Sequence, residues 1–296
     1  MRIRKLGILG DRYFDWLGRR MRPATVEGYR ASFRRIVSAL GVEGVSGLSA
    51  ELVEGYVRQR LGSGTSAATL NAEVGVLRRV LSWGSERRLI SGNALRGWRR
   101  LREVRRARRA LTVEEAGRLV RHDHPDGRGG RAECGSCRMW LVLLRTGMRP
   151  SELAGLDWSD VDFVGKRIHV RGGKSRGADR WLPMAGSVAA ALEDGRRGRG
   201  RVFELGGWPG RNLRARFYRC VRAAGIEGPV RLYSLRYTFA TWLVAPPSGC
   251  RGAPPGVVRD LLGHSTLGLA FEVYAQVLSG DKVAAIERMD EVRLEV

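Results

Sequence analysis

The sequence predicts a mostly helical protein with one small β-sheet, organised as a helical bundle followed by a mixed α+β domain. Apolar residues recur at helical spacing through the first hundred positions, and β-branched residues around a glycine-rich turn interrupt that pattern in the second half. A length of 296 residues gives room for two domains with buried cores. The expected boundaries are a bundle over residues 1–94, a connector over 95–110 and a second domain over 111–296.

Three amphipathic helices are predicted in the first domain. Residues 23–41 carry apolar side chains at helical spacing, with Pro23 in a first-turn position and a glycine at the end. Residues 49–61 form a second apolar face behind Ser49, which is a suitable N-cap. A third apolar face begins near residue 65 and ends around residue 92. These spacings predict a small helical bundle.

The connector over residues 95–110 is strongly basic, and Glu103 is its only acidic residue. Charge blocks of this kind often form a solvated linker. The functional alternative is a strap that follows a phosphate backbone between two domains. The candidates for such phosphate contacts are Arg99, Arg100, Arg105, Arg106, Arg108 and Arg109.

The second domain is predicted to open with helices. Thr112 and Glu115 match the capping-box pattern at a helix start. Residues 138–145 are apolar on nearly every side, which predicts a deeply buried helix that ends at Gly147. Pro150 then suits the first turn of the next helix.

A small sheet and further helices are predicted beyond this point. β-Branched residues indicate a hairpin over 161–170 and another strand over 180–184, with a glycine-rich turn over 171–177 between them. The remaining helices are expected after residue 186, over 211–224, after residue 233, over 257–262 and from residue 269 onward.

The net charge of +23 is the strongest compositional feature. It favours an extended polyanion as partner, most simply nucleic acid. The preference for arginine over lysine also fits a GC-rich genome, but codon bias does not explain the excess of basic over acidic residues.

Composition also bears on the cellular setting. No run of eighteen apolar residues occurs, so a membrane span is not expected. The apolar stretch near the N-terminus is short and broken by Asp11, unlike a secretory signal. The four cysteines form no evenly spaced framework, which favours a reducing, cytosolic setting.

Two arginines, a histidine and a tyrosine suggest a chemistry for this basic chain. Tyr274 lies ten residues after His264, and Arg149 and Arg236 precede both. A phenol becomes a useful nucleophile where nearby cations stabilise its anion and the charge of its target. The set therefore suggests attack on a phosphodiester.

Together these segments resemble the tyrosine recombinases, also called the phage integrase family. The resemblance rests on Thr146–Leu153 (TGMRPSEL), on Leu235–Thr241 (LRYTFAT) and on Leu262–His264 (LGH) followed by Tyr274, in the order and at the intervals of the family pattern. Lys174, in the turn before the strand that starts at Arg180, adds weaker support. The first hundred residues look like the family's helical, SAM-like core-binding domain.

The resemblance implies that Tyr274 attacks a DNA phosphodiester to form a 3′-phosphotyrosyl link, with a 5′-hydroxyl leaving. Arg149 and Arg236 can offer forked, charge-assisted donors to the non-bridging oxygens. Lys174 would protonate the leaving oxygen and His264 would donate to the phosphate. Metal and nucleotide cofactors are not needed for such a reaction.

One position departs from the family pattern. Tyr233 stands three residues before Arg236, where the family most often has histidine, and Tyr237 also replaces a common histidine. Phenol has a reference pKa of about 10 and does not readily act as a general base near neutral pH. Tyr233 can still hydrogen-bond the phosphate or the nucleophile.

A separate cluster has the residue types of a zinc site. His122, His124, Cys134 and Cys137 would supply two nitrogen and two thiolate ligands, and so a closed structural site. The His-x-His spacing is tighter than usual for zinc fingers, and a metal-free reduced loop is the alternative.

The resemblance also implies partners and a setting. We expect double-stranded DNA at specific recombination sites, a homo-oligomer on DNA such as a tetramer, and no membrane. The expected place is the cytoplasm of a prokaryote, at the nucleoid, with origin in a phage or other mobile element. A type IB topoisomerase and a catalytically silent DNA-binding relative are the alternatives.

Overall fold

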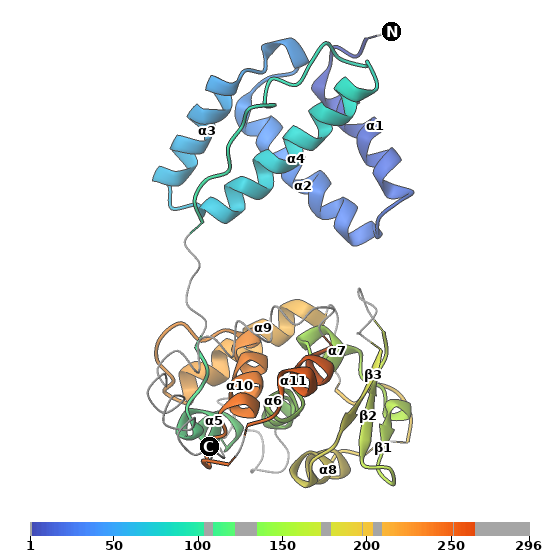
Figure 1. Ribbon diagram of the computed structural model, residues 1–296, viewed down its shortest axis with the longest axis vertical. Coiled ribbons are helices and arrows are strands. Elements are labelled where there is room, and N and C mark those ends of the chain that lie inside the picture. Colours follow the sequence, from blue (N-terminus) through green and yellow to red (C-terminus); the bar gives the residue numbers. More distant parts are fainter. Residues whose placement is uncertain are drawn as a thin grey trace, which may run out of the picture. The chain divides into compact units, whose positions relative to one another are not determined.

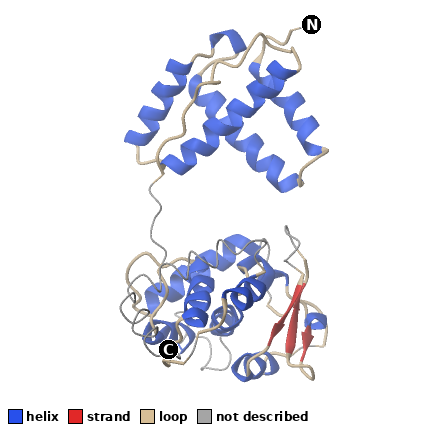
Figure 2. Cartoon of the chain, viewed as in Figure 1, coloured by secondary structure: helices blue, strands red, loops and turns tan. Residues whose placement is uncertain are grey.

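A computed structural model describes residues 2–103, 109–121, 135–172, 179–196, 198–203, 209–250 and 252–263. The chain forms two compact units, residues 1–106 and 107–296, and each is described separately. Figure 1 shows the first unit as helices and the second as helices with a small sheet. The same contrast appears in Figure 2, where strands occur in the second unit among the described residues. This mostly helical architecture with one small sheet agrees with the predicted fold class.

The first unit is built from helices α1 (Leu6–Gly18), α2 (Pro23–Leu40), α3 (Ala50–Gly62) and α4 (Ala67–Glu86), with a short 3-10 turn at Val45–Gly47. The predicted Ser49 cap is present, since its side chain accepts a hydrogen bond from the backbone N–H of Leu52, and Ser66 caps α4 in the same way through the N–H of Thr69. Helix α4 ends at Glu86, earlier than the spacing suggested.

Helix α1 was not among the predicted elements. Glycines at positions 7, 10 and 18 lower its intrinsic helix propensity. Tertiary packing explains one of them, because a Cβ atom on Gly10 would lie 2.3 Å from the Phe33 ring of α2. The short distance lets α1 and α2 pack closely, and buried Leu6, Leu9 and Phe14 then hold α1 in the core.

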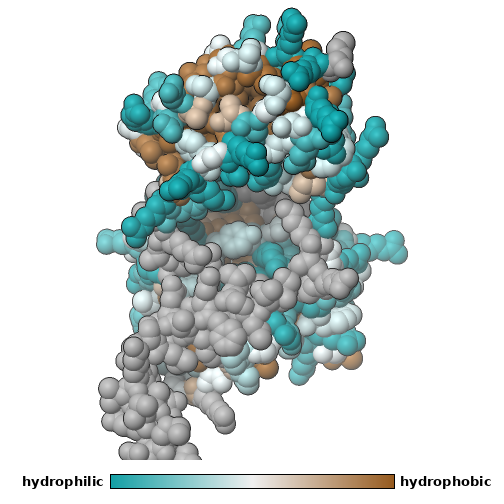
Figure 3. Space-filling model, turned by 45° about the horizontal axis from the view of Figure 1, so that its top comes forward, coloured by the Kyte–Doolittle hydropathy of each residue, from teal (hydrophilic) through white to brown (hydrophobic). Residues whose placement is uncertain are grey.

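Polar residues gather on the surface of this unit. Figure 3 shows hydrophilic side chains projecting over its visible face, with apolar residues between them. Exposed arginines include Arg12, Arg34, Arg58 and Arg99, so positive charge is spread over several elements. The segment after α4 also packs on this unit: Leu95 is buried, and Trp98 and Leu101 contact the same core.

Asn71 fixes the end of that segment. Its amide donates to the carbonyl of Leu101 at 2.9 Å and to Glu103 Oε1 at 2.8 Å, and accepts from the Leu101 N–H at 2.8 Å. Residues 95–103 of the predicted connector therefore pack against the first unit. Arg100, a predicted DNA contact, also pairs with Glu103 at 2.7 Å.

A buried carboxylate joins three helices of the first unit. Glu73 is 1% exposed and accepts from Tyr56 Oη at 2.6 Å and from Arg35 Nη1 at 2.8 Å. Arg60 Nη2 lies 3.7 Å away. Burial, followed by the hydrogen bond to Glu73, raises the pKa of Tyr56 to about 12, so the phenol remains the donor at neutral pH. The carboxylate thus ties α2 and α3 to α4.

The second unit contains α5 (Val113–Arg121), α6 (Gly135–Thr146), α7 (Pro150–Gly155), α8 (Gly186–Glu193), α9 (Pro209–Ala223), α10 (Leu232–Val244) and α11 (Pro255–Leu262). A 3-10 turn at Trp158–Asp160 precedes the sheet. Residues Met139, Trp140, Val142 and Leu143 of α6 are buried, as their unbroken apolar character predicted. Trp140 packs edge-on against Phe217 of α9, with ring centroids 5.3 Å apart.

The start of this unit is anchored by capping and by α10. Thr112 Oγ1 accepts from the Glu115 N–H at 3.2 Å, and Glu115 accepts from the Thr112 N–H at 3.0 Å, which confirms the predicted capping box. The Leu111 N–H donates to Thr238 Oγ1 on α10 at 2.9 Å. Arg109 donates to both oxygens of Glu115 and to the carbonyl of Glu227, so its guanidinium holds this corner of the unit together.

The sheet consists of β1 (Val161–Asp162), β2 (Arg167–Val170) and β3 (Arg180–Pro183), antiparallel in the order β1-β2-β3. The pairing Ile168 with Leu182 puts two buried side chains on the core face. Trp181 points away from that face and is half exposed, stacked on His169 with ring centroids 4.7 Å apart. The predicted hairpin and third strand are therefore present.

Replacing the buried Glu73 should loosen the first unit. Glu73→Gln removes the carboxylate charge facing Arg35 and Tyr56, and we expect a loss of about 2 kcal/mol, since the amide still accepts one hydrogen bond and Arg35 is half exposed. Hydrogen exchange of α2–α4 peptides in the full chain should accelerate about thirtyfold. Exposed Glu54→Gln is the control. Exchange as slow as in the wild type would contradict this role.

Candidate functional site

Arg149 lies in the turn between α6 and α7, at the N-terminus of α7. Its Nη1 donates to Glu152 Oε1 at 2.5 Å, and its backbone N–H donates to Glu152 Oε2 at 2.8 Å. Its Nη2 donates to the carbonyl of Gly263 at 3.0 Å. Glu152, one turn along the helix, thus supports Arg149, and the guanidinium lies at the end of α11.

Arg236, on α10, reaches the same place from another helix. It is 7% exposed, and its Nη1 donates to the carbonyl of Gly147 at 2.6 Å while its Nη2 donates to that of Leu262 at 2.5 Å. Burial, and then the positive charge of Arg149, lowers the pKa of Arg236 to about 10. The guanidinium is still charged at neutral pH, and the two predicted arginines are close neighbours.

The backbone before Arg149 makes this convergence sterically feasible. Gly147 ends α6 with φ +63°, a conformation that favours glycine. A Cβ atom there would lie 2.2 Å from the Phe239 ring of α10. The missing side chain therefore lets the turn approach α10, where its carbonyl meets Arg236.

Arg180 is the third arginine at this site. It begins β3, and its Nε donates to the carbonyl of Leu261 at 2.9 Å. Its Nη1 and Nη2 donate to Glu152 Oε1 and Oε2 at 3.3 and 3.0 Å. Its side chain is 8% exposed. Three arginines from three elements thus bind three consecutive carbonyls, those of residues 261, 262 and 263.

The end of α11 suits a cluster of cations. Its last carbonyls have no partner within the helix, and the helix dipole places partial negative charge there. Gly263 closes the helix in the left-handed conformation, with φ +61°. The guanidinium groups therefore stabilise the helix end, and the helix end and Glu152 offset the repulsion among the cations.

Glu152 shares its carboxylate between Arg149 and Arg180. Burial alone would raise its pKa, but the hydrogen bonds from Arg180 and from the Arg149 backbone and side chain outweigh burial, and the pKa is lowered from its ordinary value of 4.5. At neutral pH the site therefore combines one buried carboxylate with three guanidinium groups.

Tyr233 lies in the first turn of α10, three residues before Arg236, and is 60% exposed. It is near enough for its phenol to influence the pKa of Arg236. The structure therefore places this departure from the family pattern beside the arginine pair. Tyr237, the second departure, is half-buried on the same helix.

Several predicted residues lie outside the part of the chain that the structure describes. They are Lys174, His264 and Tyr274 among the predicted catalytic residues, Arg105, Arg106 and Arg108 in the connector, and His122, His124 and Cys134 of the predicted zinc site. Cys137, the fourth zinc candidate, is buried on α6. Within the described ranges, no group of three or more potential metal ligands occurs.

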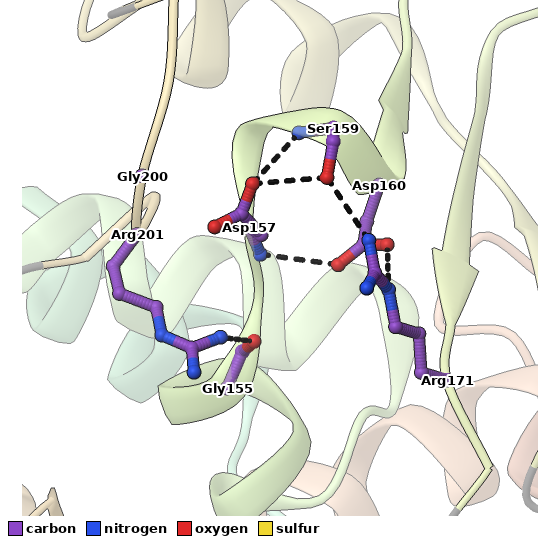
Figure 4. A pocket seen from close by; sticks show the side chains of 7 residues that line it. All are labelled: Gly155, Asp157, Ser159, Asp160, Arg171, Gly200 and Arg201. Atoms are coloured by element: carbon purple, nitrogen blue, oxygen red, sulfur yellow. Dashed lines mark hydrogen bonds and ion pairs between the residues drawn. The ribbon is translucent and has the colours of Figure 1, made fainter.

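A polar cavity of about 450 Å³ opens elsewhere on this unit, lined by Gly155, Asp157, Ser159, Asp160, Arg171, Gly200 and Arg201. In Figure 4, Arg171 reaches Asp160 and Ser159, and Arg201 reaches the carbonyl of Gly155. None of the predicted catalytic residues lines it. Its ion pair, 2.5 Å from Arg171 Nε to Asp160 Oδ1, fixes the end of β2.

Sequence reasoning did not assign Arg180 to the site. Its position contains one usable signal. Along β3, Arg180 is in phase with buried Leu182 and out of phase with exposed Trp181, so it points toward the interior. A charged residue on the core-facing side of a strand needs a partner of opposite charge, and Glu152 is that partner.

Comparison with known proteins identifies this arrangement. Residues 109–204 match the phage integrase family. The chain is 28% identical to the tyrosine recombinase XerC of Corynebacterium efficiens, over 86% of this chain and 82% of that protein. It is also 28% identical to XerC of Mycobacterium bovis, over 89% and 91%. Residues 109–204 thus form a phage integrase family segment, and these similarities together indicate a tyrosine recombinase.

Solved structures share the fold of this recombinase. The Tn1549 transposon integrase superposes with a TM-score of 0.75 and 19% identity, over 97% of this chain and 99% of that one. The lambda integrase gives a TM-score of 0.73 and 18% identity, over 91% and 77%. These likenesses show that the chain shares the fold of both integrases. No helix in the described ranges is long and apolar enough to cross a membrane.

Acid should weaken the contribution of Glu152 to stability. Because its pKa is lower in the folded chain than its ordinary 4.5, its stabilisation is complete above pH 4.5 and is lost as the pH falls through the folded-state value. We expect Glu152→Gln to be about 2 kcal/mol less stable than the wild type at pH 7, with a smaller difference below pH 4.5.

Urea unfolding followed by tryptophan fluorescence at pH 7 and pH 4 measures this difference. Exposed Glu193→Gln serves as the matched control and should show little effect at either pH. An equal loss of stability at both pH values would show that the Glu152 carboxylate is not the stabilising group.

Proposed function

We propose that Tyr274 is the nucleophile of this recombinase and that Arg149 and Arg236 bind the phosphate it attacks. The phenolic oxygen bonds to phosphorus, the bond to the 5′ oxygen breaks, and that oxygen leaves as a hydroxyl. The observation that supports this proposal most strongly is the convergence of both guanidinium groups on residues 262 and 263, directly before His264.

The two arginines suit a pentacoordinate transition state that gains negative charge. A guanidinium carries five N–H donors in a planar fork, so a group that holds a carbonyl with one N–H can present others to phosphate oxygens. Loss of one preorganised donor of this kind costs about 2.7–4 kcal/mol in comparable sites. Glu152 and the α11 carbonyls fix both groups before DNA binds, so little reorganisation is needed.

The remaining roles follow the family pattern. Lys174 protonates the departing 5′ oxygen, and His264 donates to a phosphate oxygen. Tyr233, exposed near Arg236, hydrogen-bonds the phosphate or the nucleophile. Because the phenol of Tyr233 is a poor base at neutral pH, Tyr274 passes its proton to a phosphate oxygen, and the arginine charges stabilise the phenolate.

The reaction needs no metal ion and no nucleotide. The phosphotyrosyl bond is a phosphodiester like the bond it replaces, so attack by a 5′-hydroxyl on that bond restores a DNA strand. Exchange of the attacking hydroxyl between two duplexes then gives recombination.

We infer that the partner is double-stranded DNA carrying a specific recombination site. The Tn1549 integrase structure contains transposon right end DNA, and lambda integrase was solved as a dimer on a COC′ core site and as a tetramer on a Holliday junction. A tetramer of this chain on paired sites is the corresponding assembly. The exposed Arg99 and Arg100 suit contacts with the phosphate backbone, and so do the predicted contacts Arg105, Arg106 and Arg108 further along the connector.

Recombination is favoured over the alternatives. The matching relatives named above are recombinases and integrases, whereas relaxation by a type IB topoisomerase has no comparable support. A catalytically silent binder has no need for two guanidinium groups held in place at one helix end. The bacterial relatives favour a cytoplasmic enzyme. We propose that it acts at the nucleoid, where its DNA sites would lie.

A nicked DNA substrate tests the nucleophile. With its cognate site, found by mapping the DNA bound to the chain in cells, a nick just beyond the scissile phosphate lets the short fragment that carries the new 5′-hydroxyl diffuse away, which traps the adduct. We expect a covalent complex with the wild type and with Tyr218→Phe, and none with Tyr274→Phe. A wild-type chain that binds the site without forming an adduct would support the silent binder.

We further propose that His122, His124, Cys134 and Cys137 hold a structural zinc ion. Metal analysis of the purified protein should give about one zinc per chain, lost in Cys134→Ser and retained in the control Cys250→Ser. Absence of zinc from the wild type would leave a metal-free reduced loop.

A further inference from the structure

Arg180 combines contacts that a purely structural residue of a sheet does not need. It spans from β3 to α7, through both oxygens of Glu152, and to α11, through the carbonyl of Leu261. Nearly the whole side chain is buried, at 8% exposure. A cation in such a place loses its hydration, and an apolar side chain would complete the core at lower cost. Arg180 must therefore contribute by holding Glu152 and the carbonyl of Leu261 in place.

Each partner of Arg180 also determines the position of a predicted phosphate-binding arginine. Glu152, which Arg180 contacts in a fork, binds the Arg149 side chain at 2.5 Å and its backbone N–H at 2.8 Å. The carbonyl of Leu261 directly precedes the two carbonyls that hold Arg236 and Arg149. Arg180 is thus one contact away from both guanidinium groups.

We propose that Arg180 is a positioning residue for DNA cleavage, which acts by holding Glu152 and the end of α11 so that Arg149 stays aimed at the phosphate. This inference rests on the proposed function of Arg149. Without Arg180, Glu152 loses its fork partner and can turn toward Arg149 alone, and the last turn of α11 loses one of its three guanidinium contacts. A displacement of about 1 Å at a catalytic group is enough to slow a reaction about a hundredfold.

Single-turnover cleavage of the nicked cognate site, with enzyme in excess, is the primary measurement. We expect Arg180→Gln to lower the cleavage rate about a hundredfold, with the Kd for DNA changed less than about threefold. Arg180→Lys should recover part of the rate, because it restores a charge facing Glu152 without the fork. Arg167→Gln, on the neighbouring strand and half exposed, is the matched control and should cleave at the wild-type rate.

A neutral substrate separates positioning of Arg149 from a general loss of structure. A methylphosphonate replaces one non-bridging oxygen of the scissile phosphate by a methyl group and removes its negative charge, so a correctly aimed Arg149 contributes less. The defects of Arg180→Gln and of Arg149→Ala should both shrink to less than about tenfold on this substrate. An Arg180→Gln defect of equal size on both substrates would overturn the proposal.

The double variant Glu152→Gln/Arg180→Gln tests whether Arg180 acts through Glu152. If Arg180 acts through Glu152, the double variant should cleave about as slowly as the slower single variant. A rate reduction equal to the product of the two single reductions would contradict this.

The outcomes also separate this inference from the proposed function. A wild-type chain that forms no adduct on its cognate site overturns both. A wild-type adduct together with an Arg180→Gln rate equal to that of the wild type overturns the role of Arg180 alone.

Discussion

The binding of three guanidinium groups to the carbonyls of residues 261, 262 and 263, at the end of α11, is the interaction on which the second unit depends. Arg180, Arg236 and Arg149 come from a strand, a helix and a turn far apart in the sequence, and each donates to one of these consecutive carbonyls. Like charges at such proximity repel one another. The partial negative charge of the helix end and the Glu152 carboxylate, which is 11% exposed, stabilise the cluster and hold its guanidinium groups in place.

The surrounding fold serves to present this cluster. The apolar α6 forms the centre of the unit and ends at Gly147, whose carbonyl binds Arg236 and whose missing side chain admits Phe239. The sheet delivers Arg180 because the pairing of β2 with β3 turns it to the core face. Thus the packing that stabilises the unit also fixes the guanidinium donors.

Much of the fold could be predicted from local signals. The capping residues Thr112 and Glu115, the proline at position 150 and the buried character of α6 act over a few residues, and the structure follows them. Helix α1 was missed because its glycines lower helix propensity, whereas contact with Phe33 of α2 requires one of them. The packing of residues 95–103 on the first unit depends on buried Asn71, about thirty residues earlier, and no local pattern reveals such a contact.

The chemistry could be predicted without a structure, because Arg149, Arg236, His264 and Tyr274 follow one another in the order of the tyrosine recombinase pattern, on a chain of net charge +23. The way in which the arginines are held could not be predicted, because it depends on contacts between distant segments. The partners of Arg236 lie at positions 147 and 262, and Glu152 is shared with Arg180 on a strand. Such contacts arise from the folding of distant segments onto one helix end, where unpaired carbonyls require donors.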